Sequence, residues 1–301
     1  MAEDMKKSST IGGLMLESRK KLSDAGIENA AGEVRDIMMH LLGVGSAKLF
    51  MMETETPSDK VEEIFSSIIE KRCTHYPIQY ILGSTCFLGY DFLCRENVLI
   101  PRFDTENLVA AAVSAVSGRT EPLRVLDMCT GSGCIGISYF LEREKLGVSD
   151  CVTLTDISKD ALALARDNAR KLTGCLAEDE MSPGITVKHS DLFEELTGNR
   201  YDVFLTNPPY IPTDVCDTLM KDVRDYEPRL ALDGESDGLA FYRRIIDEMG
   251  EYLNEGAHIF MEIGYDQYPA VSELLSARGY NDIDVIRDLN GLDRVVSCVK
   301  R

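Results

Sequence analysis

The sequence contains no long apolar run. No stretch approaches the ~18 apolar residues that a membrane-spanning helix requires. The first ten residues, MAEDMKKSST, carry neither an apolar signal region nor the Arg-rich, acid-poor composition of a transit peptide. We therefore expect a cytoplasmic protein without membrane association.

Residues that bind metals or form disulfides are few or badly spaced. The four histidines share no ligand spacing with the cysteines, which argues against a metal site. The nine cysteines are odd in number, contain no Cys-x-x-Cys pair and mostly fall inside apolar runs. We expect reduced thiols in the core rather than disulfides.

Positive charge is also scarce, because 32 Lys and Arg face 51 Asp and Glu for a net charge of −19. Residues 1–75 hold 10 basic and 13 acidic side chains, which leaves 22 and 38 for residues 76–301. Nucleic-acid binding needs clustered Lys and Arg, so this composition argues against direct contact with DNA or RNA. An acidic surface that serves only solubility would have the same composition.

A length of 301 residues indicates about two domains. A helix is expected over residues 10–24. Two further apolar stripes follow helical spacing, at Val34, Ile37, Met38, Leu41 and Leu42, and at Val61, Ile64, Phe65, Ile68 and Ile69. We expect a helical domain over 1–75, a β-hairpin linker over 76–100 and a larger domain over 101–301. Packing and substrate recognition are both open as roles for the helical domain.

The larger domain alternates strands and helices, which predicts an α/β fold with a mostly parallel, Rossmann-like sheet covered on both faces. Two strands without a helix between them close the chain, so the last strand should be antiparallel. The strands are expected near 123–127, 151–156, 185–189, 203–207, 258–262, 283–286 and 294–299, and the helices near 108–116, 133–143, 159–171, 237–253 and 266–278.

A glycine-rich loop follows the first strand of this sheet. Gly131-x-Gly133-x-x-Gly136 matches the dinucleotide fingerprint, in which backbone N–H groups approach a ligand. Asp127 stands directly before the loop, where a carboxylate would repel a pyrophosphate but suit the cationic groups of S-adenosylmethionine. We therefore favour that cofactor over NAD.

Polar residues end the next strands as well. Asp156 is expected to bind the ribose hydroxyls, and Asp191 to accept from the adenine amine while Leu192 and Phe193 cover the ring. Asn207 ends the following strand. The four strand ends should lie along one edge of the sheet, because open α/β sheets bind ligands there.

The motif Asn207-Pro208-Pro209-Tyr210 begins at the last of these ends. Two consecutive prolines fix φ and remove two N–H donors, leaving a rigid row of acceptors. The Asn207 side-chain oxygen, the Pro208 carbonyl and the flat Tyr210 ring suit a planar group that carries an NH₂. An amide or an exocyclic amine is such a group, whereas a plain proline turn with a buried aromatic is the structural alternative.

A second polar segment, Ile100-Pro101-Arg102, precedes the helix near 108–116. Asp104 or Thr105 is expected to cap that helix. Arg102 could pair with Glu227.

These motifs, together with Tyr80-Ile81-Leu82-Gly83 and Glu227-Pro228, closely resemble the release-factor glutamine methyltransferases of the HemK/PrmC type. The resemblance covers almost the whole chain. It implies a class I methyltransferase fold and methylation of the glutamine amide in the Gly-Gly-Gln loop of peptide release factors.

We also expect a monomer and a set of site residues. The cofactor, released as S-adenosylhomocysteine, would contact Asp127, Cys129, Thr130, Gly131, Ser132, Gly133, Asp156, Asp191, Leu192 and Asn207. The residues Asn207 to Tyr210 would be catalytic, and with Arg102 and Glu227 they would bind substrate. Cys129 departs from the family, which usually has glycine there.

Two other functions remain open. An amino-directed nucleic-acid methyltransferase shares the Asn-Pro-Pro-Tyr motif, but needs a basic groove and a pocket for an extruded base. A non-enzymatic binding module would leave Asn207 to Tyr210 unexplained.

Overall fold

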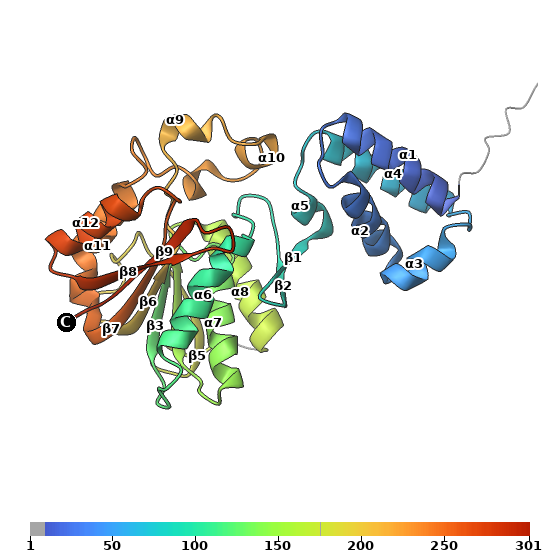
Figure 1. The fold of residues 1–301 in the computed structure, drawn as a ribbon. Helices are drawn as coiled ribbons and strands as arrows, with labels where there is room; N and C mark the ends of the chain where they lie inside the picture. The colour runs from blue at the N-terminus through green and yellow to red at the C-terminus, as the bar shows by residue number, and fades with distance from the viewer. Residues whose placement is uncertain (1–9, 175) are drawn as a thin grey trace, which may run out of the picture. The chain divides into compact units, whose positions relative to one another are not determined.

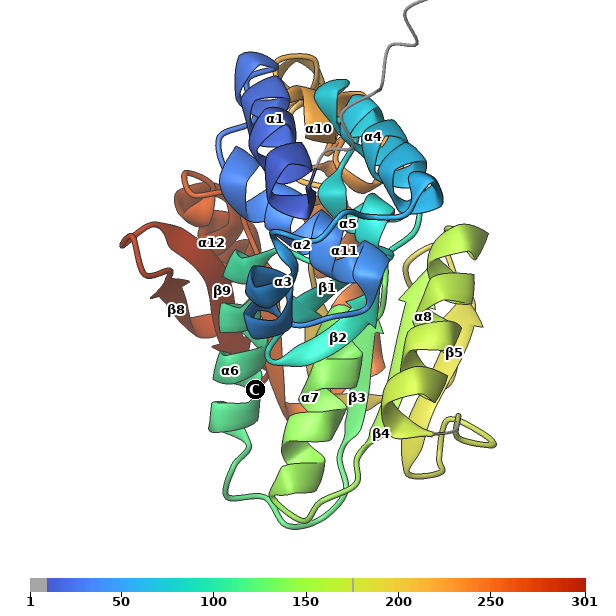
Figure 2. The ribbon, with the colours of Figure 1, turned by 90° about the vertical axis from the view of Figure 1, so that its right-hand side faces the viewer.

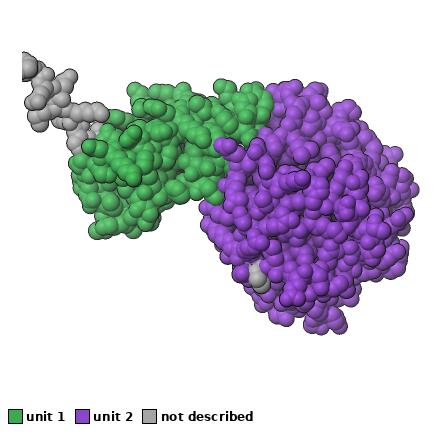
Figure 3. Space-filling model, turned by 180° about the vertical axis from the view of Figure 1, so that it is seen from behind, with its two compact units in different colours: residues 1–83, 221–226 green, residues 84–220, 227–301 purple. Residues whose placement is uncertain are grey.

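The computed structural model describes residues 10–174 and 176–301. The chain forms two compact units (Figure 3). One unit holds the chain up to residue 83 together with residues 221–226, and the other holds residues 84–220 and 227–301. Cys175, one of the expected core thiols, lies outside the described residues.

The first unit is helical (Figure 1), and none of the described helices has the length and apolar character needed to span a bilayer. Its helices are α1 (Ile11–Asp24), α2 (Ala30–Leu42), α3 (Ser46–Met52), α4 (Asp59–Cys73), α5 (Ile78–Leu82) and α10 (Lys221–Arg224).

Local sequence explains where these helices begin and end. The Ser58 side chain caps α4 by accepting from the Val61 N–H, as Ser and Thr do at helix N-termini. Helix α2 ends at Gly43, whose φ of 63° lies in the left-handed region that glycine adopts most easily.

The two predicted apolar stripes form much of the core of this unit. Val34, Ile37 and Met38 on α2 are buried with Phe65 and Ile69 on α4. Ile64 is 38% exposed, so this position of the second stripe lies outside the core.

The helical unit extends beyond residue 75, where the sequence suggested a boundary. Ile78 and Leu82 of α5 pack against the helical core. Tyr80-Ile81-Leu82 is therefore helical rather than extended, and the hairpin is shorter than the segment 76–100. Its strands are β1 (Ser84–Phe87) and β2 (Tyr90–Leu93), which pair antiparallel.

The second unit is built on a seven-stranded sheet of order β5-β4-β3-β6-β7-β9-β8. Strand β9 runs antiparallel to both of its neighbours, which confirms the predicted class I methyltransferase fold. The strands are β3 (Arg124–Met128), β4 (Cys151–Asp156), β5 (Gly184–His189), β6 (Tyr201–Thr206), β7 (Leu253–Glu262), β8 (Asn281–Arg287) and β9 (Asp293–Val299).

Helices cover both faces of this sheet (Figures 1 and 2). One face carries α6 (Glu106–Ala115), α7 (Cys134–Lys145) and α8 (Lys159–Thr173), and the other carries α11 (Ala240–Tyr252) and α12 (Tyr268–Ala277). Short helices η1 (Phe103–Thr105), α9 (Thr213–Cys216) and η2 (Arg229–Ala231) lie in the connections.

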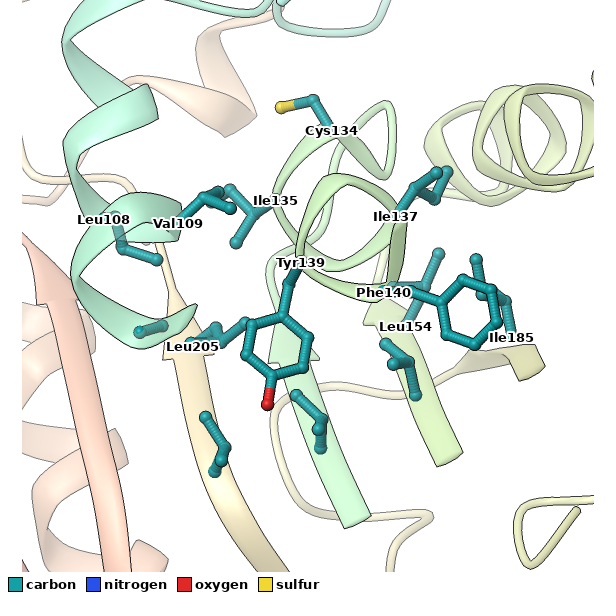
Figure 4. Close-up of a cluster of buried hydrophobic side chains, with 14 of the residues drawn as sticks. Leu108, Val109, Cys134, Ile135, Ile137, Tyr139, Phe140, Leu154, Ile185 and Leu205 are labelled. Atoms are coloured by element: carbon teal, nitrogen blue, oxygen red, sulfur yellow. The ribbon is translucent and has the colours of Figure 1, made fainter. Parts of the chain in front are cut away.

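The sheet buries apolar side chains on both faces, as parallel sheets do. On one face, Ile135 and Phe140 of α7 lie with Val109 of α6 over strand residues such as Leu154 and Leu205 (Figure 4). Successive residues of β3 point to opposite faces, since Val125 joins this cluster and Leu126 the other. This packing holds the strand ends in fixed positions.

The eight described cysteines are all free thiols. Five of them are buried, in agreement with the expected core location, but Cys86 on β1 is exposed.

Candidate functional site

The carboxyl ends of the parallel strands lie in register. Met128 at the end of β3 pairs with Thr155 on β4 and with Thr206 on β6, and Thr206 pairs with Met261 on β7. Asp156 pairs with His189 at the end of β5. The four polar residues predicted to end strands therefore lie along one edge of the sheet.

A cavity of about 920 Å³ opens along this edge. Its wall combines apolar side chains with a few polar groups, as sites for small ligands do. The lining residues are Asn97, Val98, Leu99, Met128, Cys129, Gly131, Thr155, Asp156, Ile157, Ser158, Ala161, Ser190, Asp191, Leu192, Asn207, Pro209, Pro228, Leu230, Ala231, Phe241 and Arg244.

The loop between β3 and α7 forms one wall of the cavity. Cys129, Gly131 and Gly133 have φ values of 58°, 55° and 83°, all in the left-handed region. Glycine is the default residue in this conformation, so the backbone explains why a glycine would be preferred at position 129. A Cβ at Gly133 would lie 2.7 Å from the Ile137 side chain, so that glycine also permits close packing at the start of α7.

Asp127 holds this loop from behind. Its Oδ2 accepts from the Thr130 hydroxyl at 2.5 Å and from the Gly136 N–H at 2.9 Å, whereas Oδ1 has no described partner. Burial raises the pKa of Asp127 to about 7, against the effect of those two donors, and nearby Asp156 adds to the rise. The side chain is fully buried and does not line the cavity. Asp127 therefore supports the loop in this structure, and its contact with a cofactor stays a prediction.

Asp156 lies on the cavity wall. Its Oδ2 accepts from the Gly131 N–H at 2.9 Å and its Oδ1 from the Ser158 N–H at 2.8 Å. Burial raises the pKa of this carboxyl, and the backbone donors oppose the rise. A carboxylate has about four acceptor sites, so Asp156 can still accept hydrogen bonds from two hydroxyls.

Asp191 and Leu192 form the far end of the cavity. Asp191 Oδ1 pairs with Arg244 Nη2 at 2.8 Å, and Leu192 adopts a φ of 48°. The expectation that Phe193 covers the same site is wrong. Phe193 stacks on Tyr252 with ring centroids 4.5 Å apart, in the core beneath α11.

A second, smaller cavity of about 350 Å³ shares Leu99, Cys129, Gly131 and Asn207 with the first. The Ser132 hydroxyl on its wall is buried and has no described partner, so it is available to a ligand. The other residues of this wall are Ile100, Pro101, Arg102, Thr105, Thr130, Cys134 and Ile135.

The Asn207-Pro208-Pro209-Tyr210 segment is held rigidly where the two cavities meet. Gln267 Nε2 donates to the Tyr210 carbonyl at 2.9 Å. A Cβ at Gly238 would lie 2.3 Å from the same oxygen, so no side chain fits there. Asn207 lines both cavities and Pro209 lines the larger, while Pro208 and Tyr210 line neither.

The predicted pair of Arg102 and Glu227 is present. Arg102 Nη2 lies 2.5 Å from Glu227 Oε1, and Glu227 Oε2 accepts from the Ile100 N–H at 3.1 Å. The pair anchors the Ile-Pro-Arg segment beside the second cavity. The predicted cap of α6 is not made by Asp104 or Thr105, because Thr105 at the N-cap makes no side-chain capping bond.

Sequence reasoning missed one residue of this edge. Glu262 ends β7 just as the other acids end their strands, and the same rule applied to the expected strand 258–262 would have identified it. It is 3% exposed and close enough to Asn207 for the two side chains to affect each other electrostatically.

Comparison with known proteins identifies both units. Residues 14–83 match the model of the PrmC N-terminal domain, and residues 108–226 match the model of the methyltransferase small domain.

Curated relatives match along nearly the full length. The release factor glutamine methyltransferase of Geobacter sulfurreducens is 36% identical over 279 residues, covering 93% of each chain. That of Bacillus cereus is 35% identical over 280 residues, covering 91% of this chain and 94% of the relative. A solved release factor-specific protein-(glutamine-N5) methyltransferase from Alicyclobacillus acidocaldarius is 28% identical, covering 70% of this chain and 99% of its own, with a TM-score of 0.41. The chain is therefore an enzyme of the release factor glutamine methyltransferase family.

Proposed function

We propose that this enzyme methylates the N5 atom of the glutamine side chain in the Gly-Gly-Gln motif of peptide release factors, using S-adenosylmethionine. The observation that carries the proposal is the position of Asn207. It lies at the junction of both cavities, at the end of β6, on a segment that Gln267 and Gly238 keep fixed. Family membership over both units supports the same substrate class.

The residues present fit the cofactor. Asp156 would bind the ribose hydroxyls in the larger cavity, and Asp191 with Leu192 would border adenine. The methionine part would extend into the smaller cavity, where Ser132 offers an unpaired hydroxyl. The other residues assigned to this part are Cys129, Thr130, Gly131 and Gly133, with Asp127 holding the loop that carries them.

Positioning supplies much of the catalysis, because an amide nitrogen is a poor nucleophile. The Asn207 side-chain oxygen and the Pro208 carbonyl accept the two hydrogens of the substrate amide and orient its nitrogen, and Tyr210 packs on the amide plane. When bound, the cofactor supplies an electrophilic methyl group, so a bond to nitrogen forms as the bond to sulfur breaks.

Positive charge builds on the nitrogen as it reacts. Acceptors fixed by Pro208 and Pro209 therefore stabilise the transition state more than the ground state. One proton then leaves the nitrogen to water. Orientation of this kind can contribute about 7–11 kcal/mol.

We assign recognition of the release factor to the helical unit and to the segment held by Arg102 and Glu227. On the helical unit, Leu16, Phe50 and Met51 are 69%, 73% and 69% exposed, although most other apolar side chains of the unit belong to its core or pack against it. Replacing Phe50 and Met51 by serine should raise the KM for release factor and leave cofactor affinity unchanged. Met181→Ser, at a 66% exposed methionine of the other unit, is the matched control.

Transfer of labelled methyl groups tests the proposed function. The enzyme is incubated with labelled S-adenosylmethionine and either a release factor, the same factor with its Gly-Gly-Gln glutamine changed to alanine, or DNA. We expect label on the unaltered factor alone. Label on DNA alone would favour an amino-directed nucleic-acid methyltransferase, and label on both factors would place the methyl group elsewhere.

A binding measurement tests the cofactor separately. Calorimetry should detect S-adenosylmethionine and S-adenosylhomocysteine. Tight binding of NADH, with none of either sulfur compound, would overturn the cofactor assignment.

A further inference from the structure

Glu262 is a buried acid directly beside Asn207. Thr206 pairs with Met261 across β6 and β7, so the next residues on the two strands, Asn207 and Glu262, stand opposite each other. Glu262 is 3% exposed, and its Oε2 has no hydrogen-bond partner among the described residues. It lines neither cavity, and the proposed function gives it no contact with cofactor or substrate.

Thr105 connects the two side chains. It is 2% exposed, and its hydroxyl accepts from Asn207 Nδ2 at 3.5 Å. A hydroxyl that accepts one hydrogen bond still has its own proton to donate. Thr105 is the strongest of the groups that favour the ionised form of Glu262, and Asn207 acts in the same direction. The Thr105 hydroxyl and the Asn207 amide nitrogen are both donors, which is why each favours the ionised carboxylate.

An asparagine amide carries an oxygen that accepts hydrogen bonds and an NH₂ that donates them, and its function depends on which of the two faces the ligand. To orient a substrate NH₂, Asn207 must present Oδ1 to the cavities and turn Nδ2 away. An ionised carboxylate only accepts hydrogen bonds, so it favours the orientation in which Nδ2 points back. A protonated carboxyl can donate and would stabilise the flipped amide as well.

We propose that Glu262, through Thr105, is a positioning residue that fixes the orientation of the Asn207 amide and so keeps Oδ1 facing the acceptor. This inference rests on the proposed function. It extends that function by assigning a role to a residue that does not touch cofactor or substrate.

The surroundings of Glu262 make its charge state responsive near neutral pH. Burial raises the pKa of Glu262 to about 7, against Thr105, Arg294 and Asn207, and Asp104 adds to the rise. Arg294 and Asp104 form an ion pair at 3.1 Å, so their charges largely cancel. The other titratable groups that interact with Glu262 are Tyr210, Tyr242 and Cys134, whose pKa values are all raised, so they remain neutral.

The first experiment follows the Asn207 side-chain amide by NMR in the free enzyme, between pH 5.5 and pH 8.5 (about 1.5 units either side of the midpoint). The signal is assigned by its loss in Asn207→Ala. We expect its shift to titrate near pH 7 in the wild type and to stay flat in Glu262→Gln. Titration that persists in Glu262→Gln would overturn the proposal.

The second experiment measures kinetics. Glu262→Gln should lower kcat roughly tenfold, the scale of one well-placed hydrogen bond, with little change in the KM for S-adenosylmethionine. The wild-type kcat should rise with pH, with a midpoint at or below about 7, because the cationic cofactor favours the ionised carboxyl. The variant should lose this rise. An unchanged pH profile in the variant would contradict the positioning role.

Two further sets of variants serve as controls. Glu255→Gln makes the same substitution on the same strand at a 73% exposed side chain, and should leave kcat and its pH dependence unchanged. Thr105→Val should resemble Glu262→Gln, and Thr105→Ser, which keeps the hydroxyl, should retain more activity. These two Thr105 variants test the relay even if Glu262→Gln fails to fold, and equal activity in both would contradict it.

The two sets of experiments separate this inference from the proposed function. A wild-type enzyme that does not methylate release factor would refute the function, while the NMR titration would still report on Glu262 and Asn207. A wild-type enzyme that methylates release factor, with no effect of Glu262→Gln on either readout, would refute the inference alone.

Discussion

The two halves of the site differ in how their polar groups are partnered. In the cofactor half, at the ends of β3 and β4, Asp127 and Asp156 each accept two hydrogen bonds from nearby donors. In the acceptor half, at the ends of β6 and β7, Glu262 Oε2 has no partner among the described residues, and Asn207 Nδ2 donates to the Thr105 hydroxyl at 3.5 Å.

The difference indicates two kinds of preorganisation. The cofactor half is fixed by internal hydrogen bonds, because Asp127 and Asp156 both accept from the segment between β3 and α7. The acceptor half is fixed by chain geometry, through two prolines and close glycine contacts, and the proposed function leaves Asn207 Oδ1 for the incoming amide. Mutations in the two halves should therefore affect different measurable quantities.

The largest expected effect is on turnover in the acceptor half. Asn207→Ala should lower kcat by about 10²–10³-fold, the loss seen when one preorganised polar group is removed from a transition state. Its cofactor affinity should change only a few-fold. Full turnover on a release factor would show that Asn207 is structural and that the two halves are not functionally distinct.

The charge of Glu262 should affect stability as well as turnover. A carboxyl whose folded pKa of about 7 exceeds the ordinary glutamate value of 4.5 binds more protons in the folded state than in the unfolded state. Its contribution to stability is therefore present below pH 4.5 and lost as pH rises through 7. Glutamine does not titrate. The unfolding free energy of Glu262→Gln relative to wild type should therefore increase by on the order of 3 kcal/mol from acid to pH 8.

Urea unfolding at several pH values measures this difference. Other titrating carboxyls are common to both proteins and cancel in the comparison. A constant difference across the range would mean that the pKa of Glu262 is the same in the folded and unfolded states, as for an ordinary surface acid.

In the cofactor half, Asp156→Ala should weaken S-adenosylmethionine binding by about 1–3 kcal/mol, the cost of leaving hydrogen-bonding groups unpaired. Once saturated with cofactor, the variant should turn over close to the wild-type rate. Calorimetry and saturation kinetics separate the two quantities, and Asp156→Asn, which keeps one acceptor oxygen, should lose less affinity. A fall in kcat alone would reverse the assignment of the halves.

The smallest effect is expected at Cys129, which lines both cavities. Its φ of 58° costs an ordinary L-residue roughly 1–2 kcal/mol. Cys129→Gly removes this cost but adds freedom to the unfolded chain, so it should be more stable than Cys129→Ala by about 1 kcal/mol or less. Thermal unfolding measures the difference. Equal thermal stability of Cys129→Ala and Cys129→Gly would show that the loop relaxes around position 129.

The parts of the fold that follow from periodicity were predictable. Alternating strands and helices gave the sheet and its antiparallel last strand, because βαβ units have few arrangements. The segment Tyr80-Ile81-Leu82 was misread, since a short apolar run fits a strand and a single helical turn equally well.

The site was predictable for residues at the ends of strands, because the sheet fixes where those ends lie. Strand ends placed Asp156 and Asn207 on the cavity wall, and the Arg102–Glu227 pair was correctly anticipated across a separation of 125 residues. Which way a side chain points was not predictable. Asp127 turns behind its loop and Phe193 turns into the core, because both choices depend on tertiary packing that no local pattern encodes.

The cysteine in the left-handed position of the loop also bears on the selectivity of the enzyme. A thiolate is a far better nucleophile than an amide, so a thiolate on the wall of the proposed cofactor site would be open to alkylation by the methyl donor. Burial, followed by Asp156 and Asp127, raises the pKa of the Cys129 thiol far above neutrality. The sulfur therefore stays protonated, and intact-mass analysis after long incubation with the donor should find no methyl group on Cys129. Burial, together with Asp156 and Asp127, thus also protects the enzyme from methylating itself.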